Sequence, residues 1–342
     1  MSLLKSMAVR IVRRLREPHL REVLVSTLQQ LNGGGKSTFT YHERPKIVDY
    51  RQTDSNYGDW GILVQGPPLG TDDFTVNSIR NYSQLFPGAV ILVSCWEGLD
   101  PAEQKKLETA GAKVLLNPLP EDSGPFNINY QIASTKAGLD HLSRLGLKYA
   151  IKARSDQRFH NPETINQLKA LLTAFPTEST KISERIIACS FTSLKYRPFS
   201  ISDMFQAGVI NDLIMFWDAP YDHRSKEDFK FKTVQEFTEC QIAEVYLTVN
   251  FCTRIGYDNE LTLTNYQRAL KELFCIIDAE SIDLYWPKYK GLKEYQHRYY
   301  NGAHTYDLLL FNDWLAITQG QVELSNWDED ISNTEEGGYF NE

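Results

Sequence analysis

The sequence predicts an α/β protein with a mainly parallel sheet that helices cover on both faces, followed by a mixed, aromatic-rich C-terminal lobe. From residue 59 to about residue 200, short apolar runs alternate with helix-like segments, which is typical of repeated strand and helix units. Past that point the alternation stops, and tyrosine, tryptophan and phenylalanine become frequent. The 342 residues are 42% hydrophobic and 12% aromatic, which is enough for a sizeable core in one large domain or two fused ones.

The predicted strands and helices follow one another in a regular order. Five apolar runs predict strands: WGILVQGP (60–67), AVILVSCW (89–96), AKVLLNPL (112–119), KYAIKARSD (148–156) and RIIACSFT (185–192). The segments between them predict helices at 75–86, 101–111, 128–146 and 162–175. An apolar stripe at helical spacing marks the longest of these helices, and Gly146 ends it. Further helical patterns occupy residues 233–256 and 265–278.

Composition argues against several classes of protein. The net charge of −8 and the sequence pI of about 5.5 do not favour the broad basic surface that nucleic-acid binding needs. The five cysteines are widely spread and contain no C-x-x-C pair, so neither a disulfide framework nor a zinc ribbon is expected, and a reducing cytoplasm is the simplest location. No apolar run approaches the roughly 20 residues that cross a bilayer, and arginines interrupt the apolar positions where a signal peptide would lie.

The two ends of the chain differ from the predicted α/β body. Residues 1–32 predict a basic amphipathic helix, which either packs on the rest of the protein or docks on an anionic membrane surface through residues 1–24. Residues 33–57 follow as a linker. The GGGKST that this linker contains is not a P-loop, because Gln30 stands where the first glycine of that motif is required. Residues 321–342 predict an acidic tail.

Candidate ligand-binding residues follow the first two predicted strands. Ligands of such sheets bind outside the carboxyl ends of the strands. The residues at those ends are Gln65, Gly66 and Pro67 after the first run, and Trp96 and Glu97 after the second. At Gln65 and Gly66 the alternatives are a plain turn or a close approach of the backbone to a nucleotide, since glycine has no side chain to block it. No G-x-G-x-x-G follows, so an ordinary dinucleotide site is not supported.

Three amide side chains lie at the start of the longest predicted helix: Asn127, Asn129 and Gln131. Asparagine suits the N-cap position, and the free N–H groups at a helix N-terminus favour anions. These residues therefore either cap the helix or lie near a diphosphate or ribose.

The fourth apolar run carries charges at alternating positions. In an extended strand, Lys152, Arg154 and Asp156 share one face. Burying a charge costs several kcal/mol unless it is paired or bound, so these charges pair with protein groups or serve a substrate dense in negative charge. Asp156 at the strand end is suited to a divalent metal, magnesium or manganese, that bridges two phosphates and stabilises a departing nucleoside diphosphate.

Six short motifs, taken in order, resemble the WavE-type lipopolysaccharide synthesis family: VQGP, VSCWEG, NINYQIASTKAGL, KARSD, SDMFQAG and AEVYL. The resemblance implies a glycosyltransferase with a GT-A-like, Rossmann-like fold. Residues 58–200 would form its nucleotide-sugar-binding half and residues 201–320 the acceptor-binding half of the same domain. Asp156 would stand at the metal-binding acidic motif of such transferases, although Arg154 occupies the place of the usual first aspartate. A cation of this strand would then neutralise the phosphates directly.

Two later segments predict an acceptor side. Asp203 precedes an aromatic residue and a glycine in SDMFQAG, where it would bind sugar hydroxyls or simply cap a turn. Glu244 lies in the otherwise apolar helical run CQIAEVYL, and is either paired for structural reasons or a base with a raised pKa. An inverting transferase needs such a base to remove the proton of the acceptor hydroxyl. Glu239 is a weaker candidate for the base, and His297 and His304 are candidates for closing a metal site.

The resulting hypothesis is a bacterial, cytoplasmic glycosyltransferase, either without membrane contact or peripheral at the inner membrane, according to which alternative holds for its N-terminal helix. It would move a hexose or pentose from a nucleotide sugar to a glycan or glycolipid acceptor, such as lipopolysaccharide core or capsule, with no nucleic-acid partner. Asp203 and Glu244 are its predicted catalytic residues. Ten residues are assigned to the donor: Gln65, Gly66, Pro67, Trp96, Asn127, Asn129, Gln131, Lys152, Arg154 and Asp156. The alternative is a non-catalytic scaffold of the same fold that binds a sugar or a nucleotide.

Overall fold

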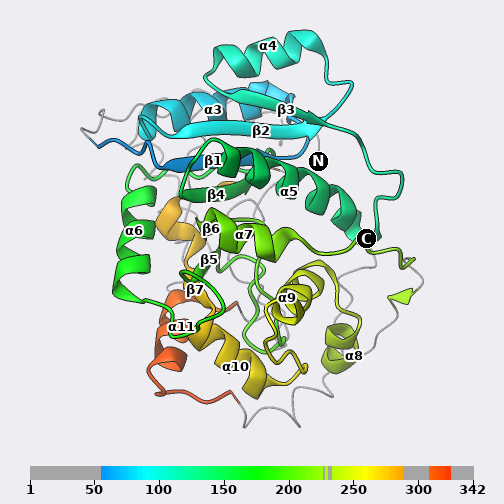
Figure 1. Ribbon diagram of the computed structural model, residues 1–342, viewed down its shortest axis with the longest axis vertical. Helices are drawn as coiled ribbons and strands as arrows, with labels where there is room; N and C mark the ends of the chain where they lie inside the picture. The colour runs from blue at the N-terminus through cyan, green and yellow to red at the C-terminus, as the bar shows by residue number, and fades with distance from the viewer. Residues whose placement is uncertain (1–54, 226–227, 230–232, 288–307, 325–342) are drawn as a thin grey trace, which may run out of the picture. The chain divides into compact units, whose positions relative to one another are not determined.

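A single seven-stranded sheet runs through the part of the chain that the structure describes. The structure is a computed structural model that describes residues 55–225, 228–229, 233–287 and 308–324, all within the larger of two compact units, Ile47–Glu342. The strand order is β3-β2-β1-β4-β6-β5-β7 (Figure 1). Several predictions lie outside the described residues: the N-terminal helix with its membrane contact, most of the linker, most of the acidic tail, and both His297 and His304.

The sheet is mainly parallel, as the sequence predicts. Its strands are β1 (Trp60–Gln65), β2 (Val90–Trp96), β3 (Lys113–Asn117), β4 (Tyr149–Arg154), β5 (Ile186–Cys189), β6 (Gln206–Val209) and β7 (Phe274–Ile277). β1 pairs parallel with β2 and β4, β2 with β3, and β5 with β7. Only β6 runs the other way, antiparallel to both β4 and β5. All five predicted strands are present, and the predicted fold class is confirmed.

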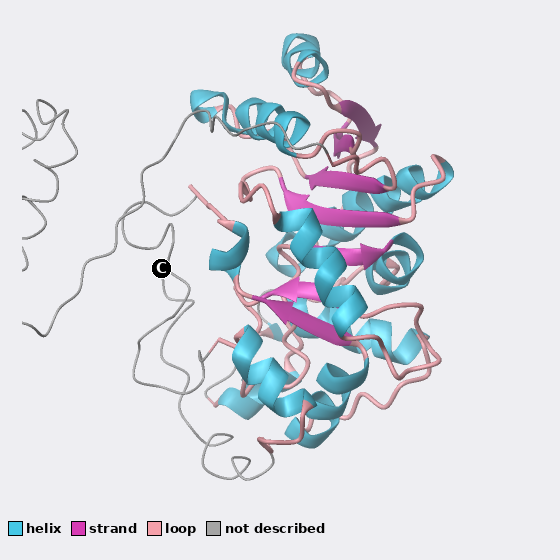
Figure 2. Ribbon diagram, turned by 90° about the vertical axis from the view of Figure 1, so that its left-hand side faces the viewer, coloured by secondary structure: helices cyan, strands magenta, loops and turns pink. Residues whose placement is uncertain are grey.

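Helices cover both faces of the sheet. The α-helices of the described residues are α3 (Phe74–Leu85), α4 (Pro101–Thr109), α5 (Ile128–Arg144), α6 (Thr164–Ala174), α7 (Ile210–Trp217), α8 (Val234–Glu239), α9 (Ala243–Arg254), α10 (Leu263–Glu272) and α11 (Phe311–Thr318). Short 3-10 turns occur at Thr71–Asp73, Pro125–Asn127 and Ala279–Ile282. α5 and α7 lie on one face, against β1, β2, β4 and β6, while α3 lies on the other (Figures 1 and 2). Within the described residues, no helix combines the length and the apolar character that a bilayer span requires.

Two glycines let α5 lie close against β1. A Cβ added to Gly61 of β1 would stand 2.7 Å from a methyl group of Leu142 on α5. A Cβ added to Gly138 of α5 would stand 2.3 Å from a methyl group of Leu63 on β1. Real Cβ atoms do not approach that closely in packed interiors, so α5 can lie this close to β1 only because both positions are glycine. The close contact holds α5, and the side chains at its N-terminal end, at a defined height above the strand ends.

The C-terminal lobe departs from its sequence pattern at two places. Residues 233–256 form two helices, α8 and α9, because Gln241 between them has a left-handed φ of 47°. Residues 265–278 begin as α10 but end as β7, whose four residues are buried beside β5. Pairing within the sheet therefore overrides the helical pattern of this segment. The packed body also extends slightly past the predicted limits of the domain, since Tyr57 and Leu324 are buried.

Candidate active site

The predicted site residues lie along one edge of the sheet. β1, β2 and β4 are parallel, so their carboxyl ends meet at a common edge. β6 runs in the opposite direction and therefore begins at that same edge. We call this edge the C-terminal rim, and define it by residues 65–67, 96–97, 154–156 and 203–206. Segments that are far apart in the sequence come together here.

A bidentate ion pair holds Asp156 at the rim. Arg154 donates from Nε to Oδ1 and from Nη2 to Oδ2 of Asp156, at 2.8 and 2.9 Å. Trp286 donates from Nε1 to Oδ2 of Asp156 at 3.1 Å, and its ring centroid lies 5.6 Å from the Arg154 guanidinium. The side chains of Arg154 and Asp156 are 21% and 20% exposed. The pair is thus ordered by its neighbours and still open to a ligand.

Lys152 does not reach the surface of the rim. The residue is fully buried, its ammonium group donates to the carbonyl oxygen of Asp203, and the ammonium lies 4.5 Å from the centroid of the Trp217 ring. Burial lowers the pKa of Lys152 to about 8, an effect that the nearby Asp203 charge partly opposes. In the structure this buried ammonium group joins β4 to the segment before β6, and the donor contact of Lys152 stays a prediction.

The end of β1 is a bonded turn beside this ion pair. Gln65 is buried and donates from Nε2 to Ser134 Oγ at 3.1 Å, so its side chain contacts α5, and the donor contact predicted for it stays a prediction. Gly66 has a φ of 100°, which favours glycine, and a Cβ there would stand 3.3 Å from Ser155 Oγ. Ser155 Oγ donates to the carbonyl oxygen of Pro67 at 2.6 Å. These contacts lock the ends of β1 and β4 together, and Gly66 and Pro67 remain predicted donor contacts.

The three amides at the start of α5 have different surroundings. Asn129 is fully buried, where it accepts from Asp222 N at 2.7 Å and donates to Asp222 O at 2.9 Å. It therefore fixes the loop after α7 to α5, and its predicted donor contact stays a prediction. Asn127 is the N-cap residue of α5 with a left-handed φ of 62°, but its exposed side chain makes no capping bond. Gln131 is buried, and its Oε1 has no hydrogen-bond partner within the described segments. Asn127, Gln131 and the half-buried Trp96 remain predicted donor contacts.

The two predicted acceptor residues are close enough to interact electrostatically. Burial raises the pKa of Glu244 to about 7, and the Asp203 charge raises it as well, while Arg197 and a hydrogen bond with Thr192 act against this shift. Glu244 is half-buried as a whole residue, but its carboxyl group is enclosed by protein atoms. A carboxyl group that titrates near neutral pH is suited to accept a proton from a bound hydroxyl.

The segment before β6 joins the two groups of charges. The carbonyl oxygen of Asp203 accepts the hydrogen bond of Lys152 from β4. Gln206 donates to the carbonyl oxygen of Ser202 at 2.9 Å and accepts from Trp217 Nε1 at 2.7 Å. β4, α7 and this segment therefore form one buried, hydrogen-bonded unit. That unit sets the spacing between the ion pair on one side and the two acids on the other.

Three residues of the site were not anticipated from the sequence: Arg197, Thr192 and Trp286. Arg197 is buried, with its guanidinium 3.5 Å from the centroid of the Phe237 ring, and its charge acts on Glu244. Thr192 has a φ of 68°, which is a strained conformation for a β-branched residue and is typical of functional sites. Their signal in the sequence was weak, because Arg197 and Trp286 do not stand at a fixed spacing along the chain from the two acids.

The side chains around Asp156 do not form a metal site by themselves. Among the residues that the structure describes, no group of three or more His, Cys, Asp or Glu side chains is placed to hold a metal. Both carboxylate oxygens of Asp156 are bonded to Arg154, and the positive charge of that guanidinium disfavours a second cation beside it. The described residues around Asp156 therefore do not by themselves supply the ligands of the predicted magnesium or manganese ion, whose other candidate ligands, His297 and His304, lie outside the described residues. Arg154 is better suited to meet phosphate oxygens itself.

Fold and rim together define a class of protein: an α/β protein whose mostly parallel sheet presents charged and acid–base side chains at the carboxyl ends of its strands. Within that class, the chain belongs to the WavE lipopolysaccharide synthesis family, whose profile matches residues 62–319. The resemblance noted in the ordered sequence motifs is thereby confirmed.

Solved structures with similarity to the chain include two related to sugar nucleotides. Glucosyl-3-phosphoglycerate synthase from Mycobacterium tuberculosis, in complex with Mn²⁺, uridine diphosphate and glucosyl-3-phosphoglycerate, is 11% identical with a TM-score of 0.39; the match covers 81% of this chain and 88% of that one. A protein from Desulfovibrio desulfuricans G20, described as a nucleotide-diphospho-sugar transferase, is 10% identical with a TM-score of 0.35, covering 64% and 80%. Similarity at this level says nothing about the chemistry of this chain. A comparison with curated proteins finds no match.

Proposed function

We propose that the chain is a glycosyltransferase that moves a sugar from a nucleoside diphosphate to a hydroxyl group of a glycan or glycolipid, in the synthesis of lipopolysaccharide or capsule. Membership of a lipopolysaccharide synthesis family supports this setting, because such glycans are built by joining sugars from activated donors. The observation that carries the proposal is the carboxyl group of Glu244, whose pKa is raised to about 7 beside Asp203. It lies next to the rim that carries the Arg154–Asp156 ion pair.

In the proposed reaction Glu244 is the general base. Its carboxylate takes the proton of the acceptor hydroxyl, whose oxygen forms a bond to the anomeric carbon of the donor sugar. The bond between that carbon and the diphosphate oxygen breaks, and the nucleoside diphosphate leaves with the electron pair. Asp203, beside Glu244, accepts hydrogen bonds from the acceptor and keeps the pKa of Glu244 raised. A group whose pKa is near the working pH serves best in this role.

Arg154 meets the diphosphate in this proposal. A guanidinium carries five N–H donors in a rigid plane, and Asp156 engages Nε and one Nη of that plane. The carboxylate thereby fixes the orientation of the guanidinium plane. Charge-assisted hydrogen bonds from this guanidinium to phosphate oxygens stabilise the charge that builds up on the leaving group.

Replacement of Asp156 by alanine should lower donor turnover about 10²-fold or more, because a misplaced Arg154 no longer matches the diphosphate. Turnover is measured as release of nucleoside diphosphate from a panel of sugar nucleotides, and folding is checked by thermal unfolding. Asp258→Ala is the matched control, since it removes an exposed aspartate paired with Arg268 at 3.0 Å, away from the rim. Unchanged turnover in Asp156→Ala would remove Asp156 from the site. If no sugar nucleotide shifts the melting temperature of the unaltered chain, the proposed function itself fails.

Chelation of divalent metals should leave donor affinity unchanged within about a factor of three, well below the tenfold change that 1.4 kcal/mol represents. The physical reason is that Arg154, which is already ordered by Asp156, supplies the positive charge. The measurement is calorimetric titration of uridine diphosphate and uridine-diphosphate glucose in EDTA and in manganese chloride. A loss of binding in EDTA that manganese restores would instead show that phosphate and water complete a metal site at Asp156.

A non-catalytic protein that binds a sugar or a nucleotide is the second candidate. It is favoured by the position of Arg154, which replaces the usual first aspartate of the acidic motif and occupies both oxygens of Asp156. Slow hydrolysis of the donor separates the two candidates. Donor binding without any hydrolysis or transfer would support the non-catalytic scaffold, whereas hydrolysis that depends on Asp156 supports the transferase.

A further inference from the structure

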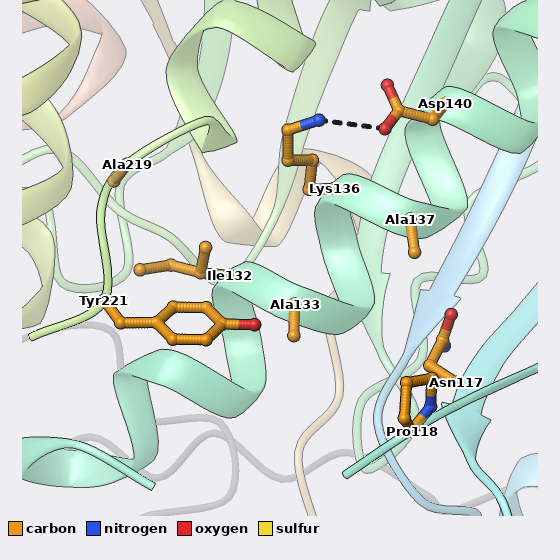
Figure 3. A pocket seen from close by; sticks show the side chains of 9 residues that line it. All are labelled: Asn117, Pro118, Ile132, Ala133, Lys136, Ala137, Asp140, Ala219 and Tyr221. Carbon is orange, nitrogen blue, oxygen red and sulfur yellow. Dashed lines mark hydrogen bonds and ion pairs between the residues drawn. The ribbon is translucent and has the colours of Figure 1, made fainter. Parts of the chain in front are cut away.

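A cavity of about 310 Å³ lies beside α5, between that helix, the end of β3 and the segment after α7 (Figure 3). Ala133 and Ala137 form its floor together with Ile132, while the end of β3 at residues 117–118 and Tyr221 after α7 form its walls. The volume lies at the lower end of the range that is typical of small-ligand sites. This cavity borders the C-terminal rim at the end of β2, because Asn117 is the register partner of Trp96 and its carbonyl oxygen accepts from Glu97 N at 2.8 Å.

The charges beside the cavity balance one another. Lys136 Nζ lies 3.0 Å from Asp140 Oδ2 and 3.8 Å from Asp218 Oδ1. Asp218 is paired in turn with Arg254, at 2.7 Å. Two cations thus face two carboxylates within this group, and neither a phosphate nor a metal ion would meet an excess of opposite charge. The arrangement favours a neutral, polar ligand that donates hydrogen bonds to the carboxylates.

Tyr221 adds an aromatic surface to this polar edge. The residue is 43% exposed, and Figure 3 shows its ring beside Ile132 with the hydroxyl group pointing towards Ala133. The small side chains of the floor leave room above α5 for a ring to lie against Tyr221. An exposed aromatic ring next to carboxylates suits a sugar, because the C–H face of a pyranose packs on the aromatic ring while its hydroxyls bond to the carboxylates.

We propose that this cavity binds a neutral sugar unit of the acceptor glycan, at a distance from the unit that receives the new sugar. The inference rests on the proposed glycosyltransferase function and specifies its acceptor as an oligosaccharide with neutral units. The cavity borders the rim at the end of β2, whereas the Arg154–Asp156 pair lies at the end of β4 with β1 between them; neighbouring strands lie about 4.8 Å apart, so about 10 Å separates the two places. An acceptor of several sugars spans that distance, so the second contact favours long acceptors over single sugars.

Saturation-transfer difference NMR on the full chain tests this site directly. The probes are glucose, galactose, mannose, N-acetylglucosamine, and the neutral oligosaccharides that mild acid releases from bacterial lipopolysaccharide. We expect saturation transfer to at least one probe, and a decrease of about fivefold or more in Tyr221→Ala, as expected when an aromatic contact worth about 1 kcal/mol is lost. Ala137→Leu, which fills the floor with a good helix former, should cause the same loss. Leu145→Ala, which trims a 42% exposed apolar residue just past the other end of α5, should not.

Two results would overturn the proposal: no transfer to any probe, or transfer that persists undiminished in both cavity variants. Titration of uridine-diphosphate glucose into the same proteins separates this test from that of the proposed function. Donor binding that stays unchanged in Tyr221→Ala while the sugar signal is lost supports a distinct acceptor site. Parallel loss of donor and sugar binding would count against a separate cavity. Failure of the donor to bind the unaltered chain would instead concern the transferase function alone.

Discussion

Replacing Glu244 by glutamine should lower the rate of sugar transfer by about 10²–10⁴-fold while leaving donor affinity unchanged. Glutamine keeps the size of the side chain and its hydrogen bond with Thr192, but it cannot accept a proton from the acceptor hydroxyl. The fall should therefore appear in kcat and leave the Kd of the nucleotide sugar as it is. Transfer is measured as product formation with an oligosaccharide acceptor, and donor affinity by calorimetric titration.

Glu239→Gln is the matched control for this variant. Glu239 is an exposed carboxylate on α8 that accepts a hydrogen bond from Gln235 at 2.8 Å, and it lies in the same sequence region as Glu244. This control should retain full transfer. If Glu244→Gln also retains it, or if both variants lose it equally, Glu244 is not the base.

The pH dependence of transfer provides a second measurement on the same residue. Because the pKa of Glu244 is raised to about 7, the carboxylate that accepts the proton becomes the main form only above that pH. The transfer rate of the unaltered chain should therefore rise as the pH passes through about 7. The residual rate of Glu244→Gln should lack this rise. A rate that stays flat through this range in the unaltered chain would contradict the assignment.

Lys152 should contribute a pH-dependent part to the free energy of unfolding, which changes by on the order of 3 kcal/mol between the folded and the unfolded pKa of its ammonium group. Replacing Lys152 by methionine should remove this part. The pKa of Lys152 is lowered from 10.5 to about 8 in the folded chain, so between these values the unfolded chain binds a proton that the folded chain does not. The stability contribution of Lys152 therefore rises with pH across that window, while the cost of burying the ammonium is fully present below about pH 8. Methionine has no such titration. Denaturant unfolding of both proteins at a series of pH values gives the difference.

Leu63→Met is the control for this comparison. Leu63 is the neighbour of Lys152 in the register of β1 and β4, is equally buried, and carries no titrating group. Its stability relative to the unaltered chain should be the same at every pH of the series. If the difference for Lys152→Met is also independent of pH, the ammonium group is not held in the interior as described.

Much of the fold follows from short stretches of sequence. The first five strands are apolar runs of four to seven residues in the structure, and all of them coincide with predicted strands. The helices that follow them also occur where helical periodicity predicts them, with ends shifted by a few residues. β7 is the exception, because its apolar residues continue a helical pattern and become a strand only through pairing with β5. Local periodicity predicts an element well when its neighbours in the sheet do not compete with it.

The site was predictable in its location more than in its contacts. The charges of β4 were expected to share one face, and to pair with protein groups or to serve a negatively charged substrate. The structure shows that Arg154 and Asp156 pair with each other. Lys152 is two residues away along the same strand, yet α7 and the segment before β6 cover it completely. Asn129 looks like a surface cap in the sequence, but the loop after α7 folds over it. Exposure at each of these positions depends on elements that arrive from elsewhere in the chain.

The sequence by itself determined which segments become strands and helices up to residue 200, that charged residues stand at the end of the fourth strand, and which family the chain resembles. Only the tertiary structure decided that β6 lies beside β4, that Asp203 lies close enough to raise the pKa of Glu244, and that Lys152 is fully buried. The reason is physical. Periodicity is written into a window of ten or so residues, whereas strand order, burial and pKa depend on contacts between residues far apart along the chain, which exist only once the chain has packed.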